Sequence, residues 1–530
     1  MQKYDVVVIG GGATGLSVLW DLVLRGVRAA LVEKDDLAAG TSARFHGLLH
    51  SGGRYAVNDI DAARECISEN RILKRVAWHC VEDCGGYFLQ MDGDDDGYVD
   101  RWVRACREAG ITVGEADPGE VLRQEPCLSP SLKRAFSVPD AAIDGFRLVY
   151  TCARLARDRG AAVFPYTRVT RILTMGGRVE GVEAEGPAGV LRLACGIVVN
   201  AAGAFAGRVA HLAGVELAMA PNRGTMIVFN HKMAGRVLNR LAPPGDADIF
   251  VPHNTTMILG TTSVDIDEPD DYRPSPGEVE RLLTRGGEMV ADLGRYRMLR
   301  AYAGVRPLYA AGAAKGRGAT RNFLLIDHAR EDGLEGLVTI TGGKFTTCRL
   351  MAEKTGDLVG AKLGRRSPCL TAERPMVEPG KKESERVRRV FAPGWGDLVA
   401  RRAAWNLDAV LAQLAGDKLA GDNLCECEGV SLAEARAACR EGAPRGLGEV
   451  RRRTRLGTGT CQGLFCGFRA AGLLVEDGLL PPEKFQPIVA EFLEKRWRGQ
   501  RAVLRERELA AAQLATGICT TLLGLERYVP

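Results

Sequence analysis

The sequence has no long hydrophobic run and no strong excess of charge. No apolar stretch reaches the ~18 residues that span a bilayer, and the apolar run at residues 6–9 leaves no room for the charged region and cleavage site of a secretory signal. A formal net charge of +5 on 530 residues is too small to favour nucleic-acid binding. We therefore expect a cytoplasmic protein with no nucleic-acid partner, which touches a membrane only peripherally.

Internal repeats and low-complexity segments are also absent. The length of 530 residues exceeds what one hydrophobic core supports and predicts about three domains. Cysteine, by contrast, is plentiful, with fifteen copies. In a chain without secretory features, most of these are expected to be buried, reduced side chains rather than disulfide partners.

Four cysteines near the C-terminus stand apart from the others by their spacing. Cys425 and Cys427 form C-x-C, a gap of 33 residues follows, and Cys461 and Cys466 form C-x4-C. Such a set can bring four thiolates onto one metal centre, as in iron–sulfur and structural zinc sites. C-x-C is tighter than the spacing of most zinc ribbons, which favours iron–sulfur and leaves zinc as the alternative.

The N-terminus has the pattern of a dinucleotide-binding unit. The apolar run at 6–9 leads into Gly10-Gly11-Gly12-Ala13-Thr14-Gly15, then a helical pattern at 16–25 and a second apolar run ending in Glu33. Glycines at these positions let backbone N–H groups approach a pyrophosphate, and the acidic residue suits a ribose hydroxyl. The turn by itself does not distinguish FAD from NAD.

Two further strand-to-glycine junctions lie far along the chain. Residues 196–199 lead into the small residues 200–206, and residues 336–340 lead into 341–347. Alternating apolar character at 224–230, 248–251 and 256–260 predicts antiparallel strands between these junctions. The nucleotide domain should therefore be interrupted by a second domain.

The C-terminal third of the chain reads as helical. A basic, proline-marked connector at about 365–380 leads to it, and Ser431 with Glu434 predicts a capped helix start within the cysteine module. The tail from Pro481 is charged and helical. Its segment 492–497 is expected to face the protein's own interior or solvent, with docking on a partner as the alternative.

Residues 41–55, TSARFHGLLHSGGRY, are the most distinctive part of the chain. With 200–206, 246–263, 304–308, 341–349 and 368–373, they resemble the FAD-dependent glycerol-3-phosphate dehydrogenases, and most closely the large catalytic subunits of the anaerobic multisubunit enzymes. The four cysteines resemble the [2Fe–2S] domain of the bacterioferritin-associated-ferredoxin type that these subunits carry. Together these segments cover nearly the whole chain.

This resemblance implies an α/β fold of the D-amino-acid-oxidase type, in which a Rossmann-like FAD-binding domain is interleaved with an antiparallel-sheet substrate domain. The expected FAD domain comprises residues 1–90, 145–215 and 300–365, and the substrate domain 91–144 and 216–299. A linker and helical region at 366–420, a helical [2Fe–2S] domain at 421–475 and a helical tail at 476–530 follow.

The resemblance also implies FAD without a nicotinamide partner, and the sequence has no second G-x-G-x-x-G after a strand. Ala43 stands where some relatives have serine, so one hydroxyl contact is in doubt. The implied FAD contacts are Gly10, Gly12, Thr14, Gly15, Glu33, Thr41, Ser42, Phe45, His46, Gly47, Leu49, Val169, Ala202, Gly203, Gly342, Gly343, Lys344, Phe345 and Thr346.

Substrate residues follow from the chemistry of a phosphorylated alcohol. A phosphate dianion needs fixed cations, for which Arg54, Arg306 and Lys344 are the candidates. Oxidation of the alcohol needs a base, and His50 matches the position of the family's suspected base. His328 is a lesser candidate for the base. The four remaining histidines outside the 41–55 segment are expected to be structural: His79, His211, His231 and His253.

The predicted reaction is oxidation of sn-glycerol 3-phosphate to dihydroxyacetone phosphate, with electrons passing from FAD through a [2Fe–2S] centre. The resemblance implies flavin-bearing and membrane-associated iron–sulfur partner subunits, with a menaquinone-type acceptor and a place at the inner face of the cell membrane. Two alternatives remain open: an amine or 2-hydroxy-acid dehydrogenase or oxidase of the same fold, and a non-catalytic electron-transfer module.

Overall fold

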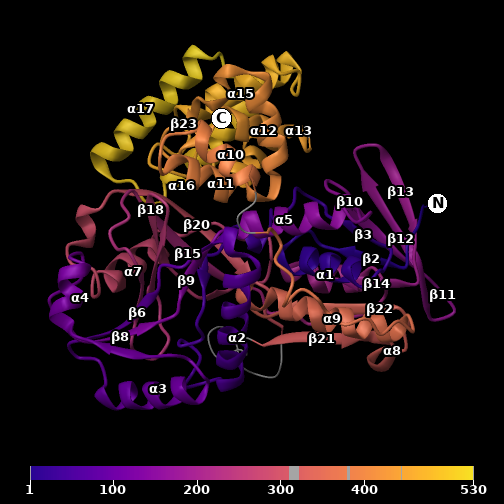
Figure 1. Ribbon diagram of the computed structural model, residues 1–530, viewed down its shortest axis with the longest axis horizontal. Helices are drawn as coiled ribbons and strands as arrows, with labels where there is room; N and C mark the ends of the chain where they lie inside the picture. The colour runs from indigo at the N-terminus through magenta and orange to yellow at the C-terminus, as the bar shows by residue number, and fades with distance from the viewer. Residues whose placement is uncertain (1, 310–321, 379–381, 443, 529–530) are drawn as a thin grey trace.

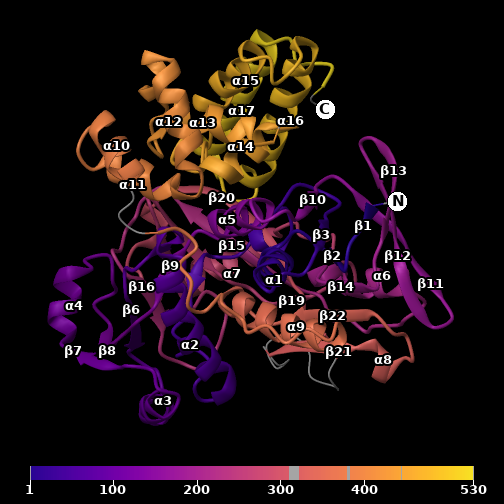
Figure 2. The ribbon, with the colours of Figure 1, turned by 45° about the vertical axis from the view of Figure 1, so that its right-hand side comes forward.

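The computed structural model describes residues 2–309, 322–378, 382–442 and 444–528. These residues form a nucleotide domain, a large-sheet domain and a helical C-terminal domain that lies across the other two (Figure 1). The same arrangement is visible after a turn of the molecule (Figure 2). Within the described ranges, no helix is both long and apolar enough to span a membrane.

The nucleotide domain is built on a six-stranded sheet. Its strands are parallel except β21, which runs antiparallel to β22. The strand order is β10 (Ala162–Phe164), β3 (Ala29–Val32), β2 (Val6–Ile9), β14 (Ile197–Asn200), β22 (Leu337–Gly342) and β21 (Phe323–Asp327). The apolar runs on either side of the N-terminal glycine turn therefore become adjacent strands, and the two distant junctions join the same sheet.

Both faces of this sheet are covered, which explains the continuous apolar runs of its central strands. Val6 and Val8 face a core formed with helices α1 (Ala13–Leu24), α5 (Gly145–Arg157) and α9 (Cys348–Lys362). Val7 and Ile9 face the opposite core. That side is covered by a four-stranded sheet of β1 (Gln2–Lys3), β13 (Gly189–Ala194), β12 (Arg178–Gly186) and β11 (Arg168–Met175).

The large-sheet domain has nine strands, mostly antiparallel. The order is β19 (Val264–Asp265), β15 (Asn222–Phe229), β18 (Thr256–Gly260), β17 (Ile249–His253), β16 (Val237–Arg240), β6 (Gly86–Met91), β8 (Leu132–Val138) and β7 (Gly114–Ala116), with β20 (Met298–Arg306) paired to β15. Its helices include α2 (Ile60–Val76), α3 (Asp96–Glu108), α4 (Pro118–Gln124) and α7 (Pro276–Gly286). A three-stranded sheet of β4 (Leu48–Leu49), β9 (Ala141–Ile143) and β5 (Val81–Glu82) contacts its core.

Two strands, β6 and β20, belong to a different domain from the one that the sequence predicted for them. The sequence placed residues up to 90 and from 300 onward in the nucleotide domain, whereas β6 and most of β20 belong to the nine-stranded sheet. A short apolar run shows that a strand exists but not which distant strand it pairs with. For β20 the consequence is functional, because this strand ends at Arg306 beside the nucleotide domain.

The C-terminal domain is helical, with one small hairpin of β23 (Asn423–Cys425) and β24 (Val430–Ser431). Its helices are α10 (Lys382–Val390), α11 (Trp395–Arg402), α12 (Leu407–Gly416), α13 (Leu432–Arg440), α14 (Leu447–Thr454), α15 (Cys466–Glu476), α16 (Phe485–Gln500) and α17 (Glu506–Leu522). Ser431 and Glu434 form the predicted capping box of α13.

The segment 492–497 faces the interior of the protein. Phe492 and Leu493 of α16 are buried in the core of the C-terminal domain, and Trp497 packs against the core of the large-sheet domain. The intramolecular interpretation of this segment is therefore correct. Helix α16 joins the two domains by burying apolar surface on both.

Candidate functional site

The turn between β2 and α1 can be built only from glycine at two positions. Gly10 has φ +117°, and a Cβ there would lie 2.5 Å from the carbonyl oxygen of Ala201. A Cβ on Gly15 would lie 1.9 Å from the carbonyl oxygen of Gly10. The backbone therefore turns tightly against β14 and brings the N-terminus of α1 to the cavity wall, as an anion-binding turn requires.

Glu33 ends β3 beside this turn. Its carboxylate accepts hydrogen bonds from the backbone N–H of Gly11 at 2.6 Å and of Asp35 at 2.9 Å. Burial raises the pKa of Glu33. The side chain lies on the wall of the same cavity as the glycine turn, where an acidic group can accept a hydrogen bond from a ribose hydroxyl.

A cavity of about 1130 Å³ runs from the glycine turn to the inner face of the large sheet. Its volume exceeds that of most small-molecule sites, as a dinucleotide together with a substrate requires. The predicted site residues that line it are Gly10, Gly12, Thr14, Glu33, Thr41, Ser42, Phe45, His46, His50, Arg54, Val169, Ala202, Gly203, Arg306, Gly342, Gly343, Lys344, Phe345 and Thr346.

Three predicted cofactor residues lie behind the wall. Gly15 is buried within α1 against Gly10, and Leu49 is part of the hydrophobic core of the nucleotide domain. A Cβ on Gly47 would lie 2.2 Å from the ring of His253. These three residues shape the backbone around the cavity without lining it.

His50, the expected base, is buried, and His46, an expected FAD contact, lies half-buried beside it. The ring centroids of His46 and His50 are 5.8 Å apart, and the backbone N–H of His50 donates to the Thr346 hydroxyl at 3.2 Å. Burial, with the positive charges of Arg306 and Arg54, lowers the pKa of His46 to about 3. Burial, with His46, Arg54 and Lys344, holds the pKa of His50 well below its ordinary value. Both imidazoles are therefore neutral at physiological pH.

Arg54 lies on the cavity wall, held by the large-sheet domain. Its Nη2 donates to the Asp248 carboxylate at 2.5 Å and to the Gly245 carbonyl at 3.0 Å. Both of its hydrogen bonds within the described part of the chain start from this one nitrogen. The other donors of the guanidinium fork can therefore serve a ligand.

Arg306 is held at the end of β20 by oxygens of β15 and of the loop after β18. Its Nη1 donates to Asn222 at 2.5 Å, and its Nη2 donates to the Thr261 hydroxyl at 2.5 Å and the Thr262 carbonyl at 2.9 Å. Sequence reasoning chose Arg306 but not Asn222 or Thr261, because no local pattern connects segments so far apart in the chain.

Lys344 and Tyr55 face the same cavity. The Nζ of Lys344 lies 5.0 Å from the centre of the Tyr55 ring, a distance typical of a cation–π contact. The Tyr55 ring lies 5.5 Å from that of His50. Arg54, Lys344 and His50 thus surround one end of the cavity, while the glycine turn lies at the other.

His253, expected to be structural, supports the site from behind the cavity wall. Its Nε2 lies 2.8 Å from the carbonyl oxygen of His46, and its ring contacts Gly47. It therefore fixes the backbone that carries His46 and His50. His253 ends an ordinary apolar strand, which gave no signal of this role.

The other histidines do not line the cavity. His79 is buried against the Thr151 hydroxyl, and His211 pairs with Glu216 at the surface. His231 stacks on Tyr296. His328, the lesser candidate for the base, bonds to Asp332 and Thr339 and does not line the cavity.

The four predicted cysteine ligands are brought together in the C-terminal domain. Cys425 and Cys466 are buried in the core of this domain, and Cys427 packs against that core. Interaction with Cys466 lowers the pKa of Cys425 and of Cys461, and Cys427 interacts with Cys461. All fifteen cysteines are free thiols. Four neighbouring thiols from two short segments match the donor set of a [2Fe–2S] cluster.

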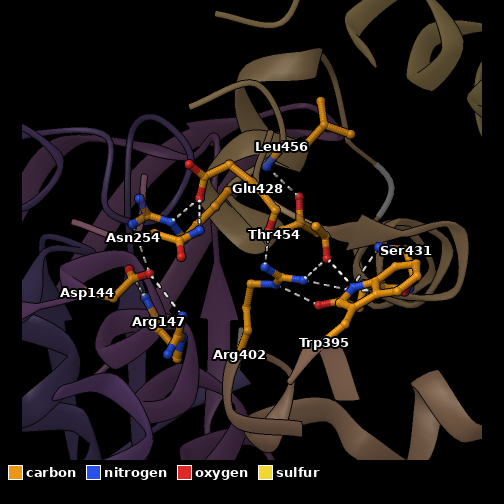
Figure 3. Close-up of polar contacts among 12 residues, drawn as sticks. Asp144, Arg147, Asn254, Trp395, Arg402, Glu428, Ser431, Thr454 and Leu456 are labelled. Atoms are coloured by element: carbon orange, nitrogen blue, oxygen red, sulfur yellow. Dashed lines mark hydrogen bonds and ion pairs between the residues drawn. The ribbon is translucent and has the colours of Figure 1, made fainter. Parts of the chain in front are cut away.

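The residue after Cys427 ties the cysteine module to the large-sheet domain. The buried carboxylate of Glu428 accepts from Asn254 at 2.9 Å and Thr255 at 3.0 Å, in the turn between β17 and β18 (Figure 3). It also pairs with Arg455 at 3.1 Å. A ligand segment and the wall of the cavity are thereby held in a fixed relation.

The same network reaches the nucleotide domain. Arg455 also pairs with Asp144, the N-cap of α5, at 3.4 Å. Behind the cysteine loop, Arg402 donates to the carbonyl oxygens of Glu428 at 2.7 Å and Gly429 at 2.6 Å (Figure 3). The cysteine module is therefore anchored to both other domains by charge-assisted hydrogen bonds.

Comparison with known proteins agrees with this arrangement of parts. Residues 5–358 match the family model described as FAD dependent oxidoreductase, and residues 424–476 match that of the BFD-like [2Fe-2S] binding domain. The chain is 41% identical over 536 residues to the A subunit of the anaerobic glycerol-3-phosphate dehydrogenase of Escherichia coli (strain K12), covering 99% of this chain and 98% of that protein.

The chain belongs to the family of anaerobic glycerol-3-phosphate dehydrogenase A subunits. The relation extends to the A1 subunit of the anaerobic glycerol-3-phosphate dehydrogenase of Haloferax volcanii, which is 39% identical over 96% of this chain and 89% of its own length. The crystal structure of the glycerol-3-phosphate dehydrogenase from Bacillus halodurans complexed with FAD has the same fold, with a TM-score of 0.70, 20% identity and coverage of 96% and 97%.

Membership in this family confirms the predicted class of fold and the two cofactors, FAD and a [2Fe–2S] cluster. The zinc alternative for the four cysteines gives way to iron–sulfur, because the matching model is that of a [2Fe–2S] domain. The non-catalytic alternative gives way to an FAD-dependent oxidoreductase, because residues 5–358 match that family model and the relative is a dehydrogenase subunit.

Proposed function

We propose that this chain oxidises sn-glycerol 3-phosphate to dihydroxyacetone phosphate. One observation carries the proposal: Arg54, Arg306, Lys344 and His50 line the same cavity as the dinucleotide-binding turn. An alcohol bearing a dianionic phosphate needs both cations and a neutral base at one place. The family's established members carry this activity in their names.

The walls of the cavity divide between the two ligands. The glycine turn at Gly10 and Gly12, with Glu33 and Ala202-Gly203, would hold the pyrophosphate and adenosine of FAD, and Val169 lies on the same wall. Thr41, Ser42, Phe45 and His46, together with residues 342–346, would hold the flavin ring. When bound, FAD supplies the two-electron acceptor, and the [2Fe–2S] cluster supplies a one-electron outlet.

Arg54, Arg306, Lys344 and His50 would act on the substrate, Lys344 in addition to its place beside the flavin. Arg54 and Arg306 orient the phosphate through charge-assisted hydrogen bonds, and Lys344 adds a further positive charge. The neutral imidazole of His50 accepts the proton of the carbinol hydroxyl. Burial, together with the surrounding cations, keeps this imidazole unprotonated. The cations also stabilise the negative charge that develops on the oxygen as its proton leaves.

Amine or 2-hydroxy-acid oxidation on the same fold is the competing function. Neither substrate has a phosphate dianion, and a single carboxylate needs fewer cations than Arg54, Arg306 and Lys344 supply. Turnover of glycerol 3-phosphate, compared with that of a D-amino acid and of a 2-hydroxy acid, separates the two functions.

The chain also requires an electron acceptor. We propose that it works in the cytoplasm as part of a multisubunit complex, with a flavin-bearing partner and an iron–sulfur partner at the inner face of the membrane. A menaquinone-type pool would be the final acceptor. The Escherichia coli relative is named as one subunit of its enzyme, which supports a complex.

The decisive experiment is anaerobic titration of the purified full-length chain with glycerol 3-phosphate. Flavin absorbance and iron–sulfur absorbance are followed together. We expect the flavin to bleach first and the cluster signal to follow. A flavin that stays oxidised with glycerol 3-phosphate but bleaches with an amine or a hydroxy acid would overturn the proposal.

A further inference from the structure

Three arginines beside the cysteine cluster have no carboxylate partner among the residues that the structure describes. They are Arg300 on β20, Arg451 on α14 and Arg496 on α16. Their neighbours differ: Arg452 and Arg453 pair with Asp36, and Arg455 pairs with Glu428 and Asp144. Carboxylates are therefore available in this region, but these three guanidinium groups are left uncompensated.

Two of these side chains carry buried N–H groups for which the described chain provides no hydrogen-bond acceptor. Arg496 is 8% exposed, and its Nε and Nη1 have no hydrogen-bond partner. The Nε of Arg300 is likewise buried without a partner. An unpaired buried cation costs free energy, so a native protein that keeps several together normally brings an anion to them.

The three arginines gather on the side of the cysteines. Arg300 donates from Nη1 to the Gln462 side chain at 3.5 Å, and Gln462 directly follows the ligand Cys461. The amide of Gln462 is fixed in turn by the carbonyls of Thr458 and Gly459. Arg300 of the large-sheet domain therefore reaches into the ligand loop itself.

Packing places the other two arginines near the thiols. Arg451 follows Val450, which shares a buried core with Cys425 and Cys466. Arg496 lies one helical turn after Phe492, whose ring packs against Gly463 and Gly467 in the ligand loop. Burial lowers the pKa of Arg300, Arg451 and Arg496. The charges of Cys466 and Cys461 act in the opposite direction, on Arg451 and Arg496 respectively. Each of these two arginines thus interacts with a different predicted ligand.

We propose that Arg300, Arg451 and Arg496 compensate the negative charge of the [2Fe–2S] cluster and raise its reduction potential. The inference rests on the cluster being held by Cys425, Cys427, Cys461 and Cys466. Four thiolates give the cluster a net negative charge that grows by one unit when it accepts one electron. Nearby fixed cations stabilise the reduced form more than the oxidised form, which favours electron acceptance from the flavin.

The test is a redox titration of the reconstituted full-length chain, followed by EPR of the reduced cluster. In each of the single variants Arg300→Gln, Arg451→Gln and Arg496→Gln, the ratio of reduced to oxidised cluster should fall about tenfold when measured at the midpoint potential of the wild type. For a one-electron couple this is a downward shift of about 59 mV. Arg451→Lys keeps the charge and should restore most of the potential.

Arg469→Gln is the matched control. Arg469 also interacts with the charges of Cys466 and Cys425, but it is 45% exposed and paired with Glu426 at 2.6 Å. Because solvent and Glu426 already screen its charge, its loss should change the ratio by less than about twofold.

A second measurement separates charge compensation from a structural role. Unfolding of the cluster-free chain should show no loss of stability in the three glutamine variants, because each removes a guanidinium group that has no carboxylate partner among the described residues. Potentials equal to wild type in all three variants would overturn the proposal, as would a loss of cluster-free stability without a shift in potential. A wild-type chain without a [2Fe–2S] spectrum would instead overturn the cluster assignment on which it rests.

Discussion

Asp248 of the large-sheet domain holds Arg54 at the cavity wall through a hydrogen bond of 2.5 Å to one guanidinium nitrogen. Arg54 comes from the segment before α2, and Asp248 lies 194 residues later, just before β17. The carboxylate fixes the direction of the fork and leaves its other donors facing the cavity. A mobile arginine would first have to lose side-chain entropy before it could bind an anion.

Replacement of Arg54 should weaken the binding of phosphorylated substrate. We expect Arg54→Gln to lower kcat/KM for glycerol 3-phosphate about 100-fold, since charge-assisted hydrogen bonds contribute ~1.5–3 kcal/mol each. Activity with unphosphorylated glycerol should change far less. Steady-state kinetics with both substrates checks this. Arg64→Gln is the control, because Arg64 is 48% exposed and pairs with the surface carboxylates of Asp61 and Glu108. An equal loss with both substrates would contradict a phosphate role for Arg54.

Protonation of His50 should reduce activity only at a pH below the usual pKa range of histidine. A base acts only when it is neutral, and the pKa of His50 is held well below 6.5 by burial, His46, Arg54 and Lys344. At saturating substrate, where the phosphate is already bound, the kcat of the wild type should therefore stay constant as pH falls through 6.5 and decrease only at lower pH. We expect His50→Asn to lower kcat about 100-fold or more.

A charge variant tests the cause of that low pKa. Arg54→Gln removes a cation near His50, so the pKa of His50 rises and the acid limb of the profile moves to higher pH. The exposed pair of His211 and Glu216 supplies a control, His211→Gln, whose profile should match the wild type. An acid limb that does not move in Arg54→Gln would show that another group controls it.

The glycine turn should not tolerate a methyl group at Gly15. A Cβ there would lie 1.9 Å from the carbonyl oxygen of Gly10, so Gly15→Ala must open the turn. Overpacking of this kind costs ~1–3 kcal/mol, which corresponds to about a fivefold or greater loss of FAD affinity. The flavin content of the purified protein and its Kd for FAD measure the effect. Gly517→Ala, where no atom lies within 4 Å, should retain FAD like the wild type.

Loss of one cysteine ligand should stop electron transfer through the cluster but leave reduction of the flavin by the substrate intact. In Cys461→Ser we expect the [2Fe–2S] absorbance and EPR signal to disappear, while glycerol 3-phosphate still bleaches the flavin. Transfer to an acceptor that depends on the cluster should stop. Cys84→Ser is the control, because Cys84 is a free cysteine of the segment between β5 and β6. An unchanged cluster signal in Cys461→Ser would remove Cys461 from the ligand set.

Arg455 should anchor the C-terminal domain. Arg455→Gln leaves the fully buried carboxylate of Glu428 and the nearly buried one of Asp144 without their shared cation. Breaking a buried ion pair in this way costs about 3 kcal/mol. Urea unfolding should show that loss, whereas Arg469→Gln, which breaks the exposed pair with Glu426, should cost less than about 1 kcal/mol. Equal stability of the two variants would argue against the anchor.

Local sequence patterns were sufficient for the parts of the site that a short segment builds by itself. The apolar run 6–9, the turn after it and Glu33 lie within one β-α-β unit, so their spacing fixes their relation in space. Cys425 with Cys427, and Cys461 with Cys466, are close pairs for the same reason. The capped start of α13 is equally local.

The amino-acid sequence was enough to predict the class of fold, the cofactor turn, the cysteine pairs and the cations of the cavity. Each of these depends either on neighbours along the chain or on a segment that specifically resembles a known family. Only the three-dimensional packing showed that His253 supports His46 and that Asn222 and Thr261 hold Arg306. It also showed that β20 joins the large sheet and that Arg300 reaches the loop of Cys461. The hydrogen bonds among these contacts join residues 45 to 207 positions apart. Pairing over such separations depends on how whole sheets and domains pack, and no local pattern of residues records it.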